Sequence, residues 1–384
     1  MIKIDNKSEC CGCTACVQAC PIDAIHMYED DEGFLYPEVS LERCIKCNNC
    51  VTVCPILNQQ SSVSQTIAYG AYNKNLDLRM QSTSGAIFST FAIYVIEKLN
   101  GVIFGAIFDD KFRVIHSYTD SVYELRKFRG SKYPQSIIKS TYLQVKEFLL
   151  NNRYVLFVGT PCQVEGLLKF LGKKYDNLFC MDFVCHGVAS PMVWREYLNN
   201  FQNPSQIETI VFKDKREGWK EWHFKIKYHS HEIWQRGFEN PFMYRFLQGM
   251  FLRPSCYNCK FKGLNRMSDF TIADCWGIGE TNTSLNDNKG LSALLIHSDN
   301  GRLVFENVKG ELKYQEYDPL ELMSGNYTTF KSVPYNPKND KFYKALKIMS
   351  FEKAFRKYCF RNSLSQTPLG KIYSWYKSRR AGNG

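Results

Sequence analysis

Two copies of one cysteine pattern near the start of the chain constrain its fold more than any other feature. Each copy has three cysteines with two-residue spacers, then a fourth cysteine after three residues, followed by proline. The copies are Cys10, Cys13, Cys16, Cys20-Pro21 and Cys44, Cys47, Cys50, Cys54-Pro55. Such short spacers leave no room for a helix between the cysteines, so the segment must wrap around what the thiolates bind. Four thiolates at this spacing are typical of a 4Fe-4S cluster.

The fourth cysteine of each run is expected to serve the cluster of the other run, as in two-cluster bacterial ferredoxins. We therefore assign cluster I to Cys10, Cys13, Cys16 and Cys54. Cluster II is assigned to Cys44, Cys47, Cys50 and Cys20. Two zinc sites are the alternative, because a Cys-x2-Cys pair also binds zinc, but two complete copies with both prolines favour iron–sulfur clusters. Cys11 lies outside the pattern and is interpreted as a spare loop position.

The length and composition are those of an ordinary globular protein. The 384 residues allow two or three domains, and 44% are hydrophobic and 23% charged. Most of the 16 cysteines fall into metal-ligand spacings, which argues against a secreted disulfide scaffold. The first motif follows the initial methionine without a signal peptide, and no apolar run reaches the length of a membrane span. We therefore expect a cytoplasmic protein, because a reducing compartment protects clusters and free thiols.

Charge is divided unevenly along the chain. Residues 1–60 hold four Lys/Arg and nine Asp/Glu, a net charge of −5. The whole chain has a net charge of +11, so the remaining residues carry +16. We expect the acidic first part to dock electrostatically on the basic body, with some positive charge around anionic cofactors. The alternative is a scattered, solvated surface charge. The basic residues are dispersed and form no RNA-binding motif, so no nucleic-acid partner is expected.

Two strand–loop–helix units carry further cysteines. Residues 154–158 are apolar throughout, as in a parallel strand buried on both faces, and residues 178–184 are predicted to form a second strand. The first leads into Thr160-Pro161-Cys162 and the second into Cys185-His186, each before a helical pattern. Right-handed crossovers place such strands side by side, with both cysteines at the carboxyl edge where open α/β sheets bind ligands.

A third cysteine set follows from this placement. Cys256 and Cys259 form a single Cys-x2-Cys pair and need two more thiolates to bind a cluster. We predict a third 4Fe-4S cluster on Cys162, Cys185, Cys256 and Cys259. Cys275 is the competing ligand because it follows a predicted strand close to the pair. Zinc and unconnected thiols remain alternatives, Cys180 is interpreted as a core thiol, and Cys359 is remote.

Two polar segments could bind an anion. Thr83-Ser84-Gly85 precedes a helical pattern, where Ser and Thr are good N-cap residues and exposed amides attract anions. Arg129-Gly130-Ser131-Lys132 is the kind of loop that holds a phosphate with backbone amides and a lysine. An ordinary surface loop is the alternative for the second segment.

Up to about Asn307, the chain resembles the beta subunit of the coenzyme F420-reducing hydrogenases and dehydrogenases. The motifs that carry the resemblance are Ser82-Thr83-Ser84-Gly85, Arg129-Gly130-Ser131-Lys132-Tyr133, Gly159-Thr160-Pro161-Cys162-Gln163, Val184-Cys185-His186-Gly187, Phe212-Lys213-Asp214-Lys215-Arg216, Cys256-x2-Cys259 and Asp274-Cys275-Trp276-Gly277. The resemblance implies FAD beside a cluster, with flavin contacts near Ser84, Gly85, Gly130, Ser131, Lys132 and Thr160. It also argues against Cys275 as a ligand, and Ala86 stands where the family usually has a second glycine.

The function expected from the resemblance is an oxidoreductase that passes electrons from clusters I and II, through the third cluster and FAD, to an organic substrate. A composition rich in Lys, Asn, Ile, Phe and Tyr indicates a low-GC genome, which argues against F420 as the substrate. For a bacterial protein, the resemblance implies a substrate related to polysaccharide biosynthesis instead. His186 is a candidate proton donor, with a structural histidine as the alternative. Lys215 and Arg216 are candidates to hold an anionic substrate, unless they form an ion-paired surface turn.

The alternative function is an electron-transfer subunit that has no substrate site and relays electrons to a partner enzyme. Either function needs a protein partner, such as a ferredoxin or a redox enzyme. The predicted fold is mixed α+β and α/β. Residues 1–58 form a ferredoxin-type domain, residues 59–66 a linker, residues 67–330 an α/β domain for FAD and the third cluster, and residues 331–384 a basic helical tail.

Overall fold

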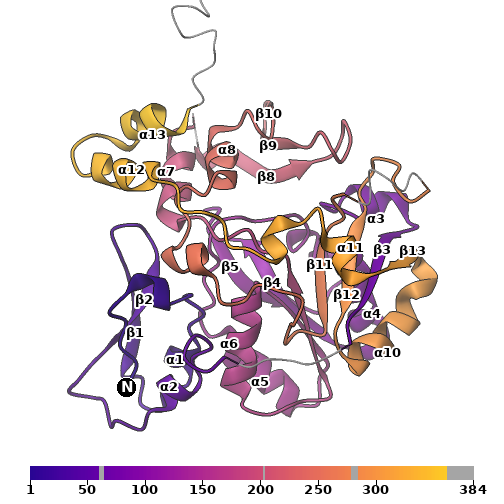
Figure 1. Cartoon of the computed structure of the whole chain (residues 1–384), viewed down its shortest axis with the longest axis horizontal. Helices are drawn as coiled ribbons and strands as arrows, with labels where there is room; N and C mark the ends of the chain where they lie inside the picture. The colour runs from indigo at the N-terminus through magenta and orange to yellow at the C-terminus, as the bar shows by residue number, and fades with distance from the viewer. Residues whose placement is uncertain (60–64, 202–203, 278–283, 361–384) are drawn as a thin grey trace, which may run out of the picture.

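The computed structural model describes residues 1–59, 65–201, 204–277 and 284–360. It has three parts: a small amino-terminal module, a large central sheet with helices on both faces, and an upper lobe with its own small sheet (Figure 1). Most of the predicted linker and the tail from residue 361, with Lys371, Lys377, Arg379 and Arg380, lie outside the described residues.

The amino-terminal module repeats one backbone conformation twice. Thr14 and Asn48 occupy equivalent positions, and both have a φ of 63° at the start of a short helix. These helices are α1 (Ala15–Gln18) and α2 (Asn49–Thr52), and an antiparallel hairpin of β1 (Ile25–Glu29) and β2 (Leu35–Val39) joins the two halves. The predicted internal repeat is therefore present in the fold as well as in the cysteine spacing.

The central sheet has eight strands in the order β13-β3-β12-β11-β7-β6-β4-β5. Its middle four strands, β11, β7, β6 and β4, are parallel, and the outer pairs are antiparallel. The bounds are β3 (Ile67–Asn73), β4 (Val102–Phe108), β5 (Val114–Thr119), β6 (Val155–Val158), β7 (Leu178–Phe183), β11 (Phe270–Asp274), β12 (Ser292–Ile296) and β13 (Leu312–Tyr317). The predicted pairing of β6 with β7 is confirmed, and their carboxyl ends share one edge of the sheet.

Helices cover both faces of this sheet because its central strands are apolar on both sides. On one face, α5 (Thr141–Leu150) and α6 (Pro161–Leu171) pack against alternate residues of β4, β6 and β7. On the other, α4 (Ile87–Leu99) and α10 (Asp299–Val308) pack against the residues between them. Two short helices, α3 (Leu76–Met80) and α11 (Pro319–Met323), lie beside β3.

The start of α4 differs from the sequence prediction. The N-cap is Ala86 in a left-handed conformation with φ 67°, and neither Ser84 nor Thr83 caps the helix. A left-handed alanine is strained, and glycine would adopt this conformation freely. Ser190, in contrast, caps α7 as predicted, and its hydroxyl accepts the backbone N–H of Val193.

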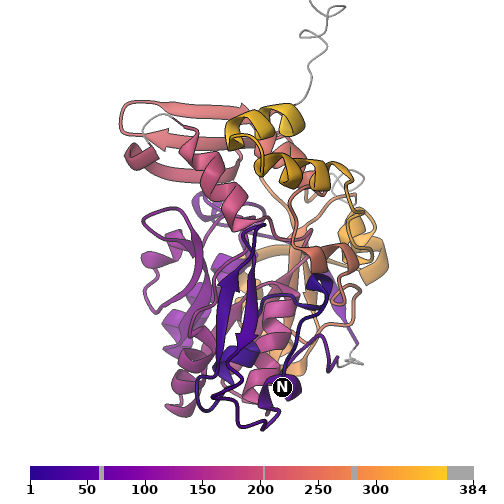
Figure 2. The same ribbon diagram turned by 90° about the vertical axis from the view of Figure 1, so that its left-hand side faces the viewer.

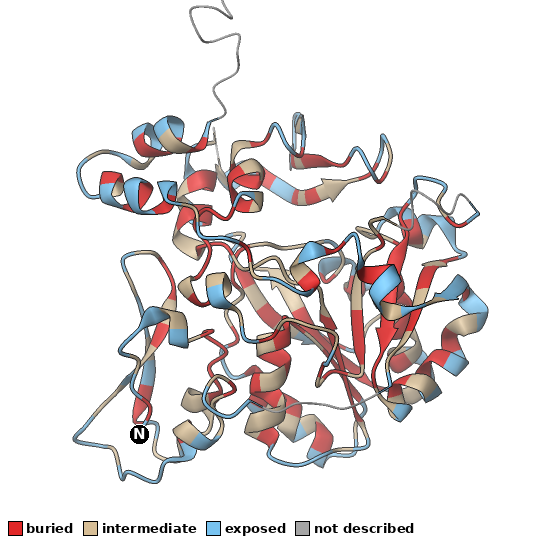
Figure 3. Ribbon diagram, viewed as in Figure 1, coloured by how far each residue is buried: buried red, intermediate tan, exposed pale blue. Residues whose placement is uncertain are grey.

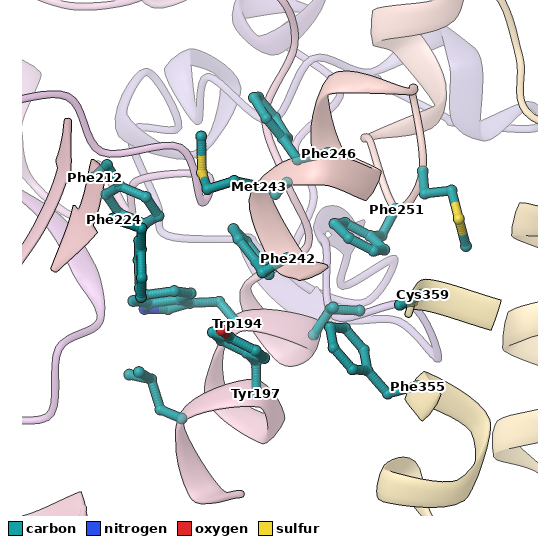
Figure 4. Packing of buried hydrophobic residues seen from close by; sticks show 14 of the residues in the cluster. Trp194, Tyr197, Phe212, Phe224, Phe242, Met243, Phe246, Phe251, Phe355 and Cys359 are labelled. Carbon is teal, nitrogen blue, oxygen red and sulfur yellow. The ribbon is translucent and has the colours of Figure 1, made fainter. Parts of the chain in front are cut away.

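The upper lobe has a separate aromatic core. Its sheet, β10-β9-β8, packs against four helices, and Figure 4 shows Trp194, Phe242 and Phe355 converging from three of them. The strands are β8 (Ile207–Asp214), β9 (His223–Tyr228) and β10 (Glu232–Arg236), and the helices are α7 (Pro191–Asn199), α8 (Pro241–Leu247), α12 (Lys338–Leu346) and α13 (Phe351–Cys359). The described part of the predicted tail is therefore helical and belongs to this core.

The module packs directly on the body beside α6 (Figure 2). Across this interface, the side chain of Gln135 donates to the carbonyl of Cys11 at 2.9 Å, and Gln18 accepts from the backbone N–H of Tyr142 at 2.9 Å. The buried guanidinium of Arg253 also donates to the carbonyls of Cys10 and Leu35. Among the described residues, two ion pairs cross the interface, Arg195–Glu29 and Lys347–Asp31, both exposed. Packing, neutral hydrogen bonds and this one buried guanidinium hold the module in place, and the exposed ion pairs are few.

Candidate functional site: three cysteine sets and a large cavity

The first cysteine set surrounds one cavity. Cys10, Cys13, Cys16 and Cys54 all line a space of about 360 Å³ between the first motif and the end of the second. The fourth cysteine therefore comes from the other run, as the crossover requires. Four thiols around a common space are the donor set of a 4Fe-4S cluster, so these residues fit the predicted group.

The second set surrounds an equivalent cavity of about 320 Å³. It is lined by Cys20, Cys44, Cys47 and Cys50, again with one cysteine from the opposite run. This cavity lies at the outer end of the module, where Cys47 is exposed and Ile45 is 63% exposed. Figure 3 shows the outer loops of the module largely exposed, whereas the strands of the central sheet are buried. The second set therefore faces solvent and the first faces the body.

The third predicted set also shares one cavity, of about 610 Å³. Cys162 lies in the first turn of α6, Cys185 follows β7, and Cys256 and Cys259 lie in and just after a 3-10 helix, η4 (Pro254–Asn258). All four residues line this cavity. Cys275 is fully buried in a different apolar cluster and is absent from the lining. Cys180 lies in the apolar cluster around α5 and α6, as expected for a core thiol. Cys359 lies in the core of the upper lobe, remote from this set as expected.

Cysteines of the first and third sets are buried deeply enough that their thiols stay protonated. Burial raises the pKa of Cys16 and of Cys185 to about 12, because an isolated thiolate loses its hydration. A bound iron centre would supply the missing positive charge, since metal coordination deprotonates a thiol. Filling these cavities is therefore expected to stabilise the fold and to release protons.

Cys11 does more than occupy a spare loop position. It is 7% exposed, and its thiol is hydrogen-bonded to both Cys13 and Cys162. Cys11 and Ile56 line the first cavity and the third cavity alike. The two cysteine sets are thus adjacent, separated by the thickness of one side chain. The motif spacing could not reveal this contact, because Cys162 is distant in sequence.

A much larger cavity opens at the carboxyl edge of the central sheet. It adjoins the third cysteine set, since both are lined by Thr160, Gln163, Cys185, His186, Gly187 and Val188. Of the predicted flavin contacts, Ser84, Gly130, Ser131, Lys132 and Thr160 line it. Gly85 does not; its backbone N–H donates to the hydroxyl of Ser292 at 2.9 Å, beneath the cavity wall.

The loop that contains Gly130 and Lys132 lines the cavity with a left-handed glycine and a lysine. Gly130 has a φ of 82°, and a side chain there would meet no atom within 4 Å. The ammonium of Lys132 donates to three backbone carbonyls, with Arg129 the nearest at 3.1 Å. Burial lowers the pKa of Lys132 to about 7. An anionic group in the cavity would restore the charge of this lysine.

The start of α6 lies beside the same cavity. Thr160 is its N-cap, and a capping box links Thr160 and Gln163 reciprocally. The hydroxyl of Thr160 lies 3.1 Å from the sulfur of Cys162. One residue therefore lines both the large cavity and the third cysteine set, at the positive end of a helix.

His186 lines both cavities but is poorly suited to donate a proton. Its Nε2 lies 3.1 Å from the carbonyl of Phe246, which can only accept, so this nitrogen carries the hydrogen. Burial lowers the pKa of His186 to about 4. The ring is therefore neutral near pH 7, and its other nitrogen can only accept a hydrogen bond.

Lys215 and Arg216 do not line the cavity. The ammonium of Lys215 donates to three backbone carbonyls, of Arg79, Ser84 and Lys289, and holds these segments together. Arg216 forms ion pairs with Asp214 and Glu232 at the surface. Arg216 therefore has the arrangement of the ion-paired surface turn considered as the alternative, whereas Lys215 is buried and makes no ion pair with another described residue.

Lys213, two residues earlier, is the basic side chain of this run that reaches the cavity. Its ammonium lies 2.7 Å from the carboxylate of Asp274 and 5.7 Å from the ring of Trp276, and all three residues line the space. Burial opposes the charge of Lys213, but the carboxylate of Asp274 more than offsets this effect. The pKa of Lys213 is therefore raised. Sequence reasoning missed this pair, although both residues belong to the motifs that carry the resemblance.

Comparison with known proteins identifies the two parts of the chain. Residues 9–57 match the 4Fe-4S dicluster domain, and residues 152–320 match the family described as the carboxyl terminus of the coenzyme F420 hydrogenase/dehydrogenase beta subunit. The resemblance inferred from the motifs is therefore confirmed. The chain therefore joins a segment that matches the dicluster domain to a segment that matches this beta-subunit family.

Two curated relatives and one solved structure are similar to the chain. The uncharacterized protein MJ1349 of Methanocaldococcus jannaschii is 26% identical over 206 residues, 45% of this chain and 56% of that relative. The chain thus spans little more than half the length of this relative. Ketoisovalerate oxidoreductase subunit VorC of Methanothermobacter marburgensis is 36% identical over 55 residues, 14% of this chain and 70% of that protein.

A chain in the xenon-derivatized F420-reducing [NiFe] hydrogenase complex from Methanosarcina barkeri aligns with a TM-score of 0.46 and 14% identity, covering 77% of this chain and 91% of that one. Within the described residues, no helix combines the length and apolar character needed to cross a bilayer.

Proposed function

We propose that this protein is an iron–sulfur flavoprotein oxidoreductase. Electrons enter at the exposed second cysteine set, pass inward through clusters held by the first and third sets, and reach an organic substrate through FAD in the large cavity. One observation carries the proposal: the three inner sites are contiguous. Cys11 and Ile56 join the first cavity to the third, and Cys185 lines both the third cavity and the large one.

The large cavity offers FAD both space and suitable polar groups. Lys132, Ser131 and Thr160, which line the cavity, would hold its phosphates through one ammonium and two hydroxyl groups. FAD, when bound, supplies the exchange between single electrons from clusters and electron pairs for an organic molecule. Thr160 and His186, which line both cavities, would hold the ring system close to the third cysteine set.

An anionic substrate would contact the part of the cavity wall formed by Lys213 and Trp276. Lys213 keeps its charge through its contact with Asp274, and Trp276 offers a flat surface for a ring system. Both F420 and a nucleotide sugar of polysaccharide biosynthesis carry phosphate groups and a ring, so both classes belong to the proposal. The relay function remains the alternative, but a cavity open to small molecules supports the enzyme.

Metal analysis of anaerobically reconstituted protein tests the three cysteine sets. We expect about twelve irons and twelve labile sulfides per chain, and about eight of each after Cys185→Ser. Cys275→Ser is the matched control, because this buried thiol lies outside the cavities, and it should keep about twelve. An iron content of about eight in the unmodified protein would remove the third cluster, and stoichiometric zinc would replace the iron–sulfur interpretation altogether.

Reoxidation experiments test the substrate. The protein is reduced by dithionite, its extracted flavin is identified, and F420, nucleotide sugars and candidate redox proteins are offered in turn as electron acceptors. Reoxidation by one small-molecule class, weakened by Lys213→Met but much less by Lys215→Met, supports the enzyme. Reoxidation by a partner protein alone would establish the relay.

A further inference from the structure

A buried arginine from the body reaches into the module beside the first cysteine set. Arg253 immediately precedes η4, the 3-10 helix that carries Cys256, and it is 1% exposed. Its Nε donates to the carbonyl of Cys10 at 2.7 Å, and its Nη2 lies 3.5 Å from the sulfur of Cys10. Arg253 thus connects the first and third cysteine sets through one side chain.

The other contacts of Arg253 are with neutral groups. Its Nη1 donates to the amide oxygen of Gln135 at 2.8 Å, its Nη2 donates to the carbonyl of Leu35 at 2.9 Å, and the guanidinium lies 4.3 Å from the ring centre of Tyr36. Among the described residues, no carboxylate lies within ion-pair distance of it. A buried cation without a negative partner is costly, and the negative groups that this site offers are the thiolates of the first set.

The second set has no buried charge of this kind among the residues that the structure describes. The amino-terminal ammonium of Met1, which lines the second cavity, is exposed and donates to the side chain of Asn48 at 2.8 Å. The sulfurs of the second set accept neutral backbone N–H groups, from Ile2 to Cys50 and from Ala24 to Cys20, both at 3.2 Å. The arginine next to it in sequence, Arg43, is exposed and donates to the carbonyl of Ile22. Water screens that charge, whereas a charge in a dry interface acts at nearly full strength.

We propose that Arg253 raises the reduction potential of the cluster held by Cys10, Cys13, Cys16 and Cys54 above that of the cluster held by Cys44, Cys47, Cys50 and Cys20. Reduction adds one negative charge to a cluster, and a nearby buried cation stabilises that charge. Burial alone acts in the opposite direction, because a dry site disfavours the more negative state; the charge of Arg253 outweighs it.

Arg253 would thereby set the direction of electron flow. An external one-electron donor protein reduces the exposed cluster, which is reoxidised as the electron moves to the first cluster. The inference rests on the proposed function, because it requires both clusters to be present. It adds a residue of the body that controls the redox balance of the module.

Redox titration of the full reconstituted chain, followed by electron paramagnetic resonance, tests the inference. In the unmodified protein the first cluster should have the higher potential, and Cys47→Ser, which removes a ligand of the exposed cluster, assigns the signals. Arg253→Gln keeps hydrogen-bond donors but loses the charge. This variant should change the ratio of reduced first cluster to reduced second cluster at least tenfold in favour of the second. That change is about 59 mV for a one-electron couple.

Two controls separate charge from structure. Arg253→Lys keeps the charge and should retain most of the difference, and Arg43→Gln, which removes an exposed charge, should change the partition less than threefold. A first cluster with the lower potential in the unmodified protein, or an unchanged partition in a folded Arg253→Gln, overturns the inference. The measurement on the unmodified protein decides the sign even if a variant fails to fold. Protein without iron would instead overturn the proposed function.

Discussion

The two halves of the amino-terminal module have nearly the same backbone but opposite surroundings. Gly12 and Lys46 are equivalent positions with φ values of 71° and 58°, and Cys11 and Ile45 precede them. Cys11 is 7% exposed against the body, whereas Ile45 is 63% exposed to solvent. The same cysteine pattern therefore produces an inner site coupled to the body and an outer site open to a partner. The residues between the ligands, and not the ligands, make the difference.

Exchanging the residues at positions 12 and 46 should have the largest effect on stability. A side chain at Gly12 would begin 2.7 Å from Nη1 of Arg253, in a left-handed conformation. Gly12→Lys should therefore cost at least about 3 kcal/mol or release the module, because strain and overpacking add. Lys46→Gly, which relieves a left-handed lysine, should change stability by less than about 1 kcal/mol. Denaturant unfolding and limited proteolysis measure both variants, and equal stabilities would refute the contrast.

The second exchange concerns the residues just before these two. Cys11→Ile inserts a branched side chain between two cavities and should cost about 1–3 kcal/mol. Ile45→Cys alters an exposed side chain and should change stability by less than about 0.5 kcal/mol. Thermal unfolding of the metal-loaded proteins provides the comparison. A harmless Cys11→Ile would mean that the first and third sites are less tightly packed than the structure indicates.

The large cavity, which is lined by Lys132, should bind FAD in a pH-dependent way. The pKa of Lys132 is about 7 in the free protein because of burial, and an anionic ligand should raise it. Binding then takes up a proton above pH 7, so FAD affinity should fall as pH rises, by at most about tenfold per unit, or 1.36 kcal/mol. Calorimetric titration should show this slope lost in Lys132→Gln and kept in Lys127→Gln, an exposed control. If Lys132→Gln left the slope unchanged, a group other than Lys132 would take up the proton on FAD binding.

The smallest effect is expected from the exposed ion pairs at the interface. Glu29 is paired with Arg195 and Asp31 with Lys347 near solvent, where such pairs contribute little. Glu29→Gln and Asp31→Asn should each lower stability by less than about 0.5 kcal/mol, and docking of the module should hardly change with salt. Proteolytic release of the module at low and high ionic strength measures this. A strong salt dependence would restore the electrostatic docking expected from the charge division.

Local sequence patterns predicted a large part of this architecture. Cysteine spacing indicated both sets of the module and their crossover, because the ligands of each run are close along the chain. The buried strands β6 and β7, and the Ser190-Pro191 start of α7, were also predicted correctly. Apolar periodicity and helix capping depend on neighbouring residues, and such signals are visible without a structure.

Contacts between distant segments could not be predicted in this way. Lys213 and Lys215 are both basic residues of one run, and only the packing at the end of β8 turns the first toward the cavity and the second toward backbone carbonyls. Cys11 was interpreted as a spare residue because its neighbour Cys162 lies in α6.

By itself, therefore, the sequence determined which thiols form the two sets of the module and which strands carry the other cysteines. Tertiary structure alone decided that the third set adjoins the first, that a large cavity follows it, and that Arg253 lies between module and body. The physical reason is that spacing constrains residues along one segment, whereas burial and charge at a site depend on every segment packed around it.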